Sequence, residues 1–311
     1  MKHLAVGLFH DDTLGRELGK KDTESDIAMF NLKTDGRIFT FMSPVEDKLS
    51  PKSQIASSID AAILAFNGMT RELGETIVML DALSISKGIA VTSQYVAADQ
   101  VSSITKGTSL ESFSIESRDP IRIIENLKML HPDRDTISPS IVVLDHAFNV
   151  RGVGEVILGF VRKGVVRKFD KLTLLPSRKD VLVRSIQIQD EDFDEAEAGT
   201  RVGLAVKGAG IDELKRGAIL CSDDNVKLDN RLKLSYETSP FYSEGVRKGA
   251  FHVTVGMQTV PITILEKYDG TIIAESDRPV AYSPEDVFVL LDLNGKNARV
   301  MGKARAELSH C

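Results

Sequence analysis

Short apolar runs alternate with amphipathic stretches along the first 130 residues. Four runs that are apolar throughout or rich in β-forming side chains predict strands: Leu4–Phe9, Arg37–Met42, Ala61–Phe66 and Gly88–Thr92. Between the last two, Arg71–Ser84 places its apolar residues at helical spacing. Pro120–Leu130 repeats that pattern after Asp119, a favourable N-cap. The alternation predicts an open parallel sheet with helices on both faces.

The pattern changes near residue 132. The segment His131–Pro139 is polar and carries two prolines, which predicts a linker. After it no long helical period occurs, and short β-like runs separated by glycines or charged turns predict β-barrels or sandwiches. A polar break at Ser222–Asn225 divides these runs into two units of similar length. We therefore predict three domains, at residues 1–136, 137–225 and 226–311.

Composition narrows the class of protein. The chain has 311 residues, 42% of them hydrophobic, which excludes a disordered protein. Its two cysteines, Cys221 and Cys311, exclude a disulfide framework and a clustered cysteine zinc site. No apolar run approaches the roughly 18–20 residues that span a membrane. We expect a cytoplasmic protein that has neither a membrane nor DNA as a partner, and no metal site.

The net charge of −6 is unevenly distributed. Residues 1–136 carry a net charge of −5, and the remaining 175 residues carry −1. The acidity therefore belongs mainly to the first predicted domain, and the later domains can still present basic patches.

The end of the first predicted strand is where a phosphate-binding loop would start. Such a loop reads G-x-x-x-x-G-K-[ST], with backbone amides and lysine on the phosphates and a hydroxyl on magnesium. This chain offers Gly7, Asp11, Asp12 and Thr13 as candidate nucleotide-binding residues, but no lysine and no second glycine. The two carboxylates would repel a polyphosphate unless a magnesium ion bound them. GTP and magnesium therefore stay open as cofactors.

Several ordered motifs after the linker carry a family resemblance. They are Leu144-Asp-His-Ala-Phe, Gly164–Pro176, Val183-Arg-Ser-Ile186, Ala198–Ala205 and Val253–Pro261. Together they resemble domains 2 and 3 of translational GTPases of the EF-Tu class. The forms Asp-His-Ala-Phe and Val-Arg-Ser-Ile are most similar to SelB, the branch dedicated to one unusual aminoacyl-tRNA. With the degenerate first domain described next, the chain as a whole resembles the archaeal EF-Pyl type of SelB-like factors.

The resemblance implies a fold and a damaged nucleotide site. The expected fold is a degenerate, P-loop-like α/β G domain followed by two EF-Tu-like β-barrels. Met42–Glu46 stands where the family has its Asp-x-Pro-Gly-His, and Thr92–Tyr95 stands where it reads guanine with Lys and Asp. With the loop lysine also missing, the resemblance implies no catalytic residue and a pseudo-GTPase.

The resemblance also implies candidate tRNA contacts. Gln187 falls where EF-Tu has a glutamate that stacks on the terminal adenosine, and Arg201 falls where SelB-like proteins carry an arginine near the aminoacyl pocket. In the last domain, Arg247, Lys248 and His252 are candidates for a contact with the tRNA stem. Domain 2 also carries a basic run that could follow an RNA backbone, formed by Arg162, Lys163, Arg167, Lys168, Lys171, Arg178, Lys179 and Arg184. For each, an ordinary exposed surface residue is the alternative.

Three functions remain open from the sequence. The first is an elongation factor that binds a specialised aminoacyl-tRNA and has lost or altered its use of GTP. The second is a divergent but working GTPase. The third is a non-catalytic protein that docks to the ribosome or to another translation factor. Composition does not separate the first from the third.

Overall fold

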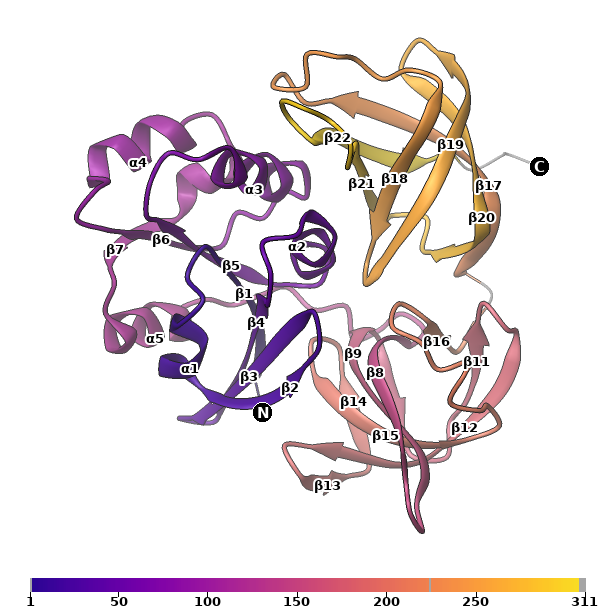
Figure 1. The fold of residues 1–311 in the computed structure, drawn as a ribbon. Helices are drawn as coiled ribbons and strands as arrows, with labels where there is room; N and C mark the ends of the chain where they lie inside the picture. Colours follow the sequence, from indigo (N-terminus) through magenta and orange to yellow (C-terminus); the bar gives the residue numbers. More distant parts are fainter. Residues whose placement is uncertain (1, 224, 308–311) are drawn as a thin grey trace.

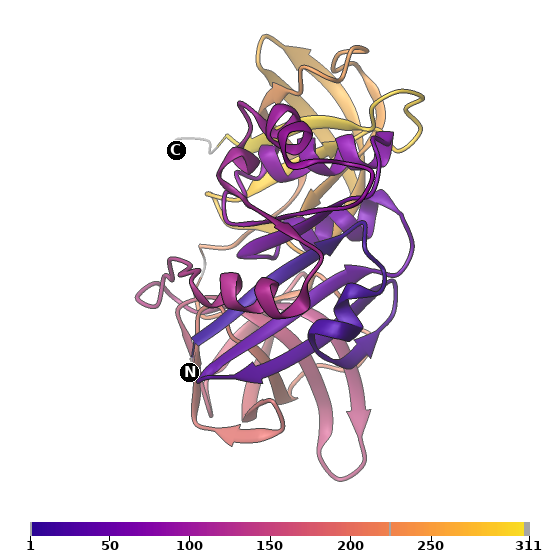
Figure 2. The same ribbon diagram turned by 90° about the vertical axis from the view of Figure 1, so that its left-hand side faces the viewer.

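The structure, a computed structural model, describes residues 2–223 and 225–307; Cys311 and the end of the third predicted domain lie outside them. Three units follow one another along the chain, and the first of them contacts both of the others (Figure 1). Figure 2 shows this first unit in front of the other two. A mixed α/β domain is followed by two barrels, as the resemblance implied. The boundaries predicted at residues 136 and 225 stay predictions.

The first domain contains a seven-stranded sheet of order β2-β3-β4-β1-β5-β6-β7. Its strands are β1 (Lys2–Phe9), β2 (Lys20–Glu24), β3 (Ile27–Thr34), β4 (Arg37–Pro44), β5 (Ala61–Phe66), β6 (Gly88–Thr92) and β7 (Ser114–Ser117). The predicted parallel sheet is confirmed for β4-β1-β5-β6-β7, whereas at one edge β3 pairs antiparallel with both β4 and β2. The β3–β4 turn contains Asp35 and Gly36 at positive φ, which matches the twist of a tight hairpin.

Helices cover both faces of this sheet, as predicted. They are α1 (Leu14–Leu18), α2 (Leu49–Ala56), α3 (Arg71–Ala82), α4 (Ala98–Thr105) and α5 (Pro120–Lys128), with a 3₁₀ turn, η1, at Ser109–Ser112. Side chains alternate along β1, so that Leu4, Val6 and Leu8 pack with α1 and α5. Ala5 and Phe9 pack with α2 and α3 on the opposite face. The central strand is therefore buried on both sides.

The predicted N-cap of α5 is confirmed. The Asp119 carboxylate accepts a hydrogen bond of 2.9 Å from the amide of Ile121, and Pro120 occupies the first turn. At α3 the hydroxyl of Thr70 accepts a hydrogen bond from the amide of Leu73, although no sequence argument had singled it out. Both caps satisfy amides that the helix itself cannot pair.

The middle unit is a closed barrel, here called the middle barrel. Its strands are β8 (Ile141–Val150), β9 (Gly154–Lys163), β11 (Lys171–Leu175), β12 (Lys179–Ile188), β15 (Arg201–Lys207) and β16 (Ile219–Cys221). The barrel closes because β11 pairs with both β12 and β16. Three short strands lie outside the ring: β13 (Glu191–Phe193), which extends the sheet beside β12, and the pair β10 (Val165–Arg167) and β14 (Glu195–Glu197).

The third unit, the last barrel, is also closed. Its order is β17-β20-β19-β18-β21-β22. The strands are β17 (Lys227–Thr238), β18 (Gly249–Val255), β19 (Gln258–Tyr268), β20 (Thr271–Tyr282), β21 (Val287–Leu291) and β22 (Val300–Ala306). Closure leaves neither barrel with an open edge in its ring.

Buried polar contacts join the first domain to the last barrel. Helix α3 lies against β22, and the Arg299 guanidinium donates hydrogen bonds of 2.9 and 2.6 Å to the two carboxylate oxygens of Glu75. Glu75 is only 5% exposed. The hydroxyl of Ser53 on α2 lies 2.7 Å from the hydroxyl of Thr254 on β18. One apolar cluster continues through all three units, so the units share part of their core.

The linker is fixed at its centre. Arg134 donates hydrogen bonds of 2.5 and 2.6 Å to both carboxylate oxygens of Asp60, a residue that follows α2. A further bond of 3.1 Å goes to the carbonyl of His3. Gly199 of the middle barrel lies against the same guanidinium, where a Cβ atom would be 2.1 Å from its central carbon.

We expect Arg299→Ala to lower the free energy of unfolding by about 3 kcal/mol, because it leaves the Glu75 carboxylate buried without its main partner. Lys21→Ala is the control, since it removes an exposed pair with Glu24 and should cost no more than about 0.5 kcal/mol. Thermal unfolding of both variants measures the difference. Equal effects would show that the Arg299 contact contributes little.

Candidate functional site

The predicted phosphate loop begins later than the sequence suggested. Gly7 lies inside β1, which continues to Phe9, so Gly7 is not the glycine of a loop. A methyl group there would lie 2.7 Å from the Phe9 ring and 2.9 Å from Ile59. Gly7 is therefore needed for close packing against α2. The backbone first turns at His10, which has a φ of 64°.

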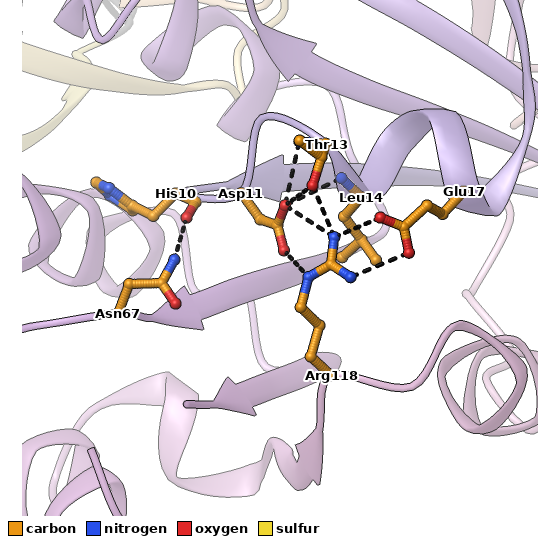
Figure 3. Close-up of polar contacts among 7 residues, drawn as sticks. All are labelled: His10, Asp11, Thr13, Leu14, Glu17, Asn67 and Arg118. Carbon is orange, nitrogen blue, oxygen red and sulfur yellow. Dashed lines mark hydrogen bonds and ion pairs between the residues drawn. The ribbon is translucent and has the colours of Figure 1, made fainter. Parts of the chain in front are cut away.

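Asp11 occupies the position in front of α1. Its Oδ1 accepts hydrogen bonds of 3.1 and 3.0 Å from the backbone amides of Thr13 and Leu14, and one of 3.1 Å from the Thr13 hydroxyl (Figure 3). Amides at the start of a helix are the groups that would otherwise bind a phosphate. Here the chain's own carboxylate already accepts their hydrogen bonds.

Arg118 joins this group from the edge strand of the sheet, β7, three positions from β1 in the strand order. It follows β7, and its guanidinium donates hydrogen bonds of 2.6 Å to Asp11, 2.8 Å to Thr13, and 2.7 and 3.0 Å to Glu17 (Figure 3). Sequence reasoning missed this arginine. The available signal was its place directly after a strand, since the carboxyl ends of parallel strands meet at one edge of the sheet.

These contacts shift the pKa values of the residues in the cluster. Burial raises the pKa of Asp11, but hydrogen bonds from Arg118 and Leu14 outweigh this, and the pKa lies below its ordinary value of 3.8. Hydrogen bonds from Arg118 lower the pKa of Glu17, and those bonds in turn raise the pKa of Arg118. The cluster is therefore a fully ionised ion-pair network at neutral pH.

Asp12 lies apart from that network. It is exposed and lines a separate cavity of about 310 Å³ with His10, Lys52 and Asn67. The Lys52 ammonium is buried and paired with Asp47. Burial, with a contribution from Lys52, lowers the pKa of His10 to about 4, so His10 is neutral at neutral pH.

The segment Thr92–Tyr95, which aligns with the family's guanine-reading motif, is held by its own contacts. Within Thr92–Tyr95, Ser93 donates a hydrogen bond to the Phe66 carbonyl and Tyr95 is 73% exposed. In residues 2–223 and 225–307, no group of three or more His, Cys, Asp or Glu side chains could hold a metal ion. Among the same residues, no helix combines the length and apolar character needed to cross a bilayer.

A second cavity, of about 400 Å³, lies between the first domain and the middle barrel. Both Gln187 and Arg201 line it, so the structure brings these two sequence candidates together. Gln187 is exposed on β12 and donates a hydrogen bond of 2.9 Å to Asp192. The first domain contributes Asp22, Thr23 and Asn31 to the opposite wall. We call this space the interdomain cavity.

Arg201 is the most enclosed of the candidates, at 7% exposed. Its guanidinium pairs with Asp22 of the first domain and lies 3.4 Å from a carboxylate oxygen of Asp145 in the middle barrel. Arg216 also approaches Asp145 and pairs with Asp26. The Nε atom of Arg201 is buried and has no hydrogen-bond partner among the described residues.

The other candidates lie outside the interdomain cavity. Arg184 is exposed and donates to the Val153 carbonyl, 3.0 Å away. In the last barrel, Arg247 donates to the Tyr242 hydroxyl and lies over the Phe251 ring, while Lys248 is exposed. Burial lowers the pKa of the half-buried His252.

Part of the basic run pairs within the protein. Arg162 donates a hydrogen bond of 2.6 Å to Asp286, and Lys163 pairs with Glu285, both in the last barrel. These two residues therefore help to hold the barrels together.

Comparison with known proteins gives the relationships of the chain. Residues 154–221 match the family Elongation factor Tu domain 2. An uncharacterized protein of Methanocaldococcus jannaschii is 38% identical over 306 residues, which cover 97% of this chain and 99% of that protein. The selenocysteine-specific elongation factor of the same organism is 30% identical over 246 residues, 71% of this chain. These cover 52% of that factor, so the chain matches about half of its length.

Solved structures agree with these sequence matches. The apo form of the translation elongation factor SelB from Methanococcus maripaludis superposes with a TM-score of 0.83 and 25% identity, covering 99% of this chain and 80% of that one. Its complex with the GTP analogue GppNHp gives a TM-score of 0.84 at 24% identity, which shows a shared fold.

We expect Asp11→Asn to lower stability by about 1 kcal/mol at pH 7, since hydrogen bonds to a partly exposed charged group are worth this much. Because the folded pKa of Asp11 is depressed, its contribution is complete above the ordinary value of 3.8 and is lost as the pH falls through the folded pKa. The difference from wild type should therefore shrink below about pH 4. Asp12→Asn is the control, and thermal unfolding between pH 3 and pH 7 measures both. A difference for Asp11→Asn that stays constant down to pH 3 would contradict the network.

Proposed function

Because the chain belongs to the SelB-like branch of the elongation factor Tu family, we propose that it is a translation factor that binds a specialised aminoacyl-tRNA. The interdomain cavity carries this proposal. It joins Gln187 and Arg201, the two residues that the resemblance assigns to the aminoacylated end of the tRNA. Its volume of about 400 Å³ lies in the usual range for a ligand pocket. Selenocysteine specificity is stated for a relative and is not part of the proposal.

We further propose that the first domain no longer uses GTP. The amides in front of α1 are already bonded to Asp11, and Arg118 is saturated by Asp11, Thr13 and Glu17. A bound triphosphate would have to displace these contacts and would then face two carboxylates without a loop lysine. This supports a pseudo-GTPase whose first domain serves as one wall of the tRNA site.

A cytoplasmic location and contact with the ribosome are part of the proposal that the protein is a translation factor. They are supported by the kind of relatives that the chain has, among them elongation factor 1-alpha of Methanospirillum hungatei, 33% identical over 94 residues. The candidate tRNA-stem residues Arg247, Lys248 and His252 are proposed on the same basis, as is Arg184.

Filter binding of charged and uncharged tRNA tests the proposal. We expect charged tRNA to bind at least about tenfold more tightly, because only the charged form can fill the interdomain cavity. Gln187→Ala should weaken binding of charged tRNA by about tenfold. Gln94→Ala removes the same atoms from an exposed loop and should have no effect. Equally negligible binding of both tRNA forms would reject the proposal and favour the docking protein.

Calorimetric titration with GTP and magnesium tests the loss of nucleotide use. We expect no saturable binding up to about 1 mM, and the same affinity for charged tRNA with and without GTP. Saturable binding in the micromolar range would instead support the divergent, working GTPase.

A further inference from the structure

The interdomain cavity has two chemically different walls. Its apolar wall is formed by the middle barrel, where Phe148, Val153 and Leu158 line it. The polar wall is formed by Asp22, Thr23 and Asn31 from β2 and β3, together with Arg201. A guest in this space would lay an apolar stem on one wall and face hydrogen-bonding groups on the other.

The charges around the polar wall do not cancel. Arg201 is shared between Asp22 and Asp145, and Arg216 between Asp145 and Asp26, so two guanidinium groups face three carboxylates. At the rim, Asp190 adds a fourth carboxylate in the turn between β12 and β13. The nearby Lys33 is paired with Glu191, and Arg184, which donates to the carbonyl of the lining residue Val153, offsets one of the four carboxylates. The surroundings of the cavity therefore carry excess negative charge, although an arginine lines it.

Arg201 does not offset this excess. Its side chain is almost completely buried and its guanidinium already pairs with Asp22 and Asp145, so its charge is compensated before a guest enters. A carboxylate or a selenolate in the cavity would therefore meet the field of Asp22 and Asp190 in a partly enclosed space.

We propose that the interdomain cavity selects amino acids with neutral or positively charged side chains and rejects negatively charged ones. Asp22 and Asp190 are its specificity-determining residues. The inference rests on the proposed binding of aminoacyl-tRNA and deepens it by naming the class of amino acid. Arg201 considered alone would suggest a negatively charged side chain, and the inference is the opposite.

The test compares two amino acids that differ in charge but hardly in size. One tRNA is charged with glutamine or with glutamate by an acylation ribozyme, and filter binding measures the dissociation constants against the uncharged tRNA. We expect the glutamate form to bind about tenfold more weakly than the glutamine form. Equal or tighter binding of the glutamate form overturns the inference while leaving the proposed function intact. Failure of both charged forms to bind more tightly than uncharged tRNA overturns the proposed function, and the inference with it.

Variants locate the source of the selection. Asp190→Asn preserves the positive φ of its turn, which asparagine tolerates, and should reduce the difference between the two forms to within about threefold. Asp22→Asn, checked for folding by its thermal midpoint, should act in the same direction. Asp35→Asn is the matched control and should leave the difference unchanged, because Asp35 also has a positive φ in a turn but pairs with Lys128 and does not line the cavity. An unchanged difference in Asp190→Asn and in folded Asp22→Asn would overturn the assignment of these carboxylates.

Discussion

The arrangement of the first domain and the middle barrel depends on the buried guanidinium of Arg201, which lies beside the buried carboxylate of Asp145 in its own barrel and pairs with Asp22 across the interface. Arg201 and Asp145 are both almost completely buried, and buried charges are tolerated only when they are paired. Arg201 has two carboxylate partners, one in its own barrel and one on β2 of the first domain. If the units separated, this guanidinium would lose half of its compensation. Arg201 and Asp22 also form part of the wall of the interdomain cavity.

The two candidate sites show opposite uses of negative charge. At the start of α1, Asp11 bonds to helix amides and is held by Arg118, so a carboxylate of the chain takes the place of an external anion. Around the interdomain cavity the carboxylates outnumber the arginines, and space remains for a guest. The acidic side chains of the first 136 residues are therefore found in two places. At the start of α1 they are paired within the chain, and at the interdomain cavity they border a space that a ligand can enter.

The sequence predicted the regular parts of this fold well. The bounds of β5 and β6 agree with their apolar runs, because strands buried on both faces admit few polar residues. The edge strand β2 was missed because its residues are mostly charged and exposed, so no apolar run marks it. The Asp35-Gly36 pair did mark the neighbouring hairpin between β3 and β4. Gly7 was misassigned because a packing glycine and a loop glycine look alike in sequence. The contacts of Arg118 could not be predicted, since they join segments about a hundred residues apart.

The grip of Asp60 on Arg134 has a mechanical consequence for the interdomain cavity. This ion pair anchors the middle of the linker to the first domain, so that the linker cannot act as one long flexible hinge. Rotation of the first domain against the middle barrel would have to break the bidentate ion pair between Arg134 and Asp60. The Arg134 guanidinium also lies directly against the backbone of Gly199 in the middle barrel. We therefore expect the interdomain cavity to be largely pre-formed, so that a ligand entering it loses little free energy to ordering of the walls.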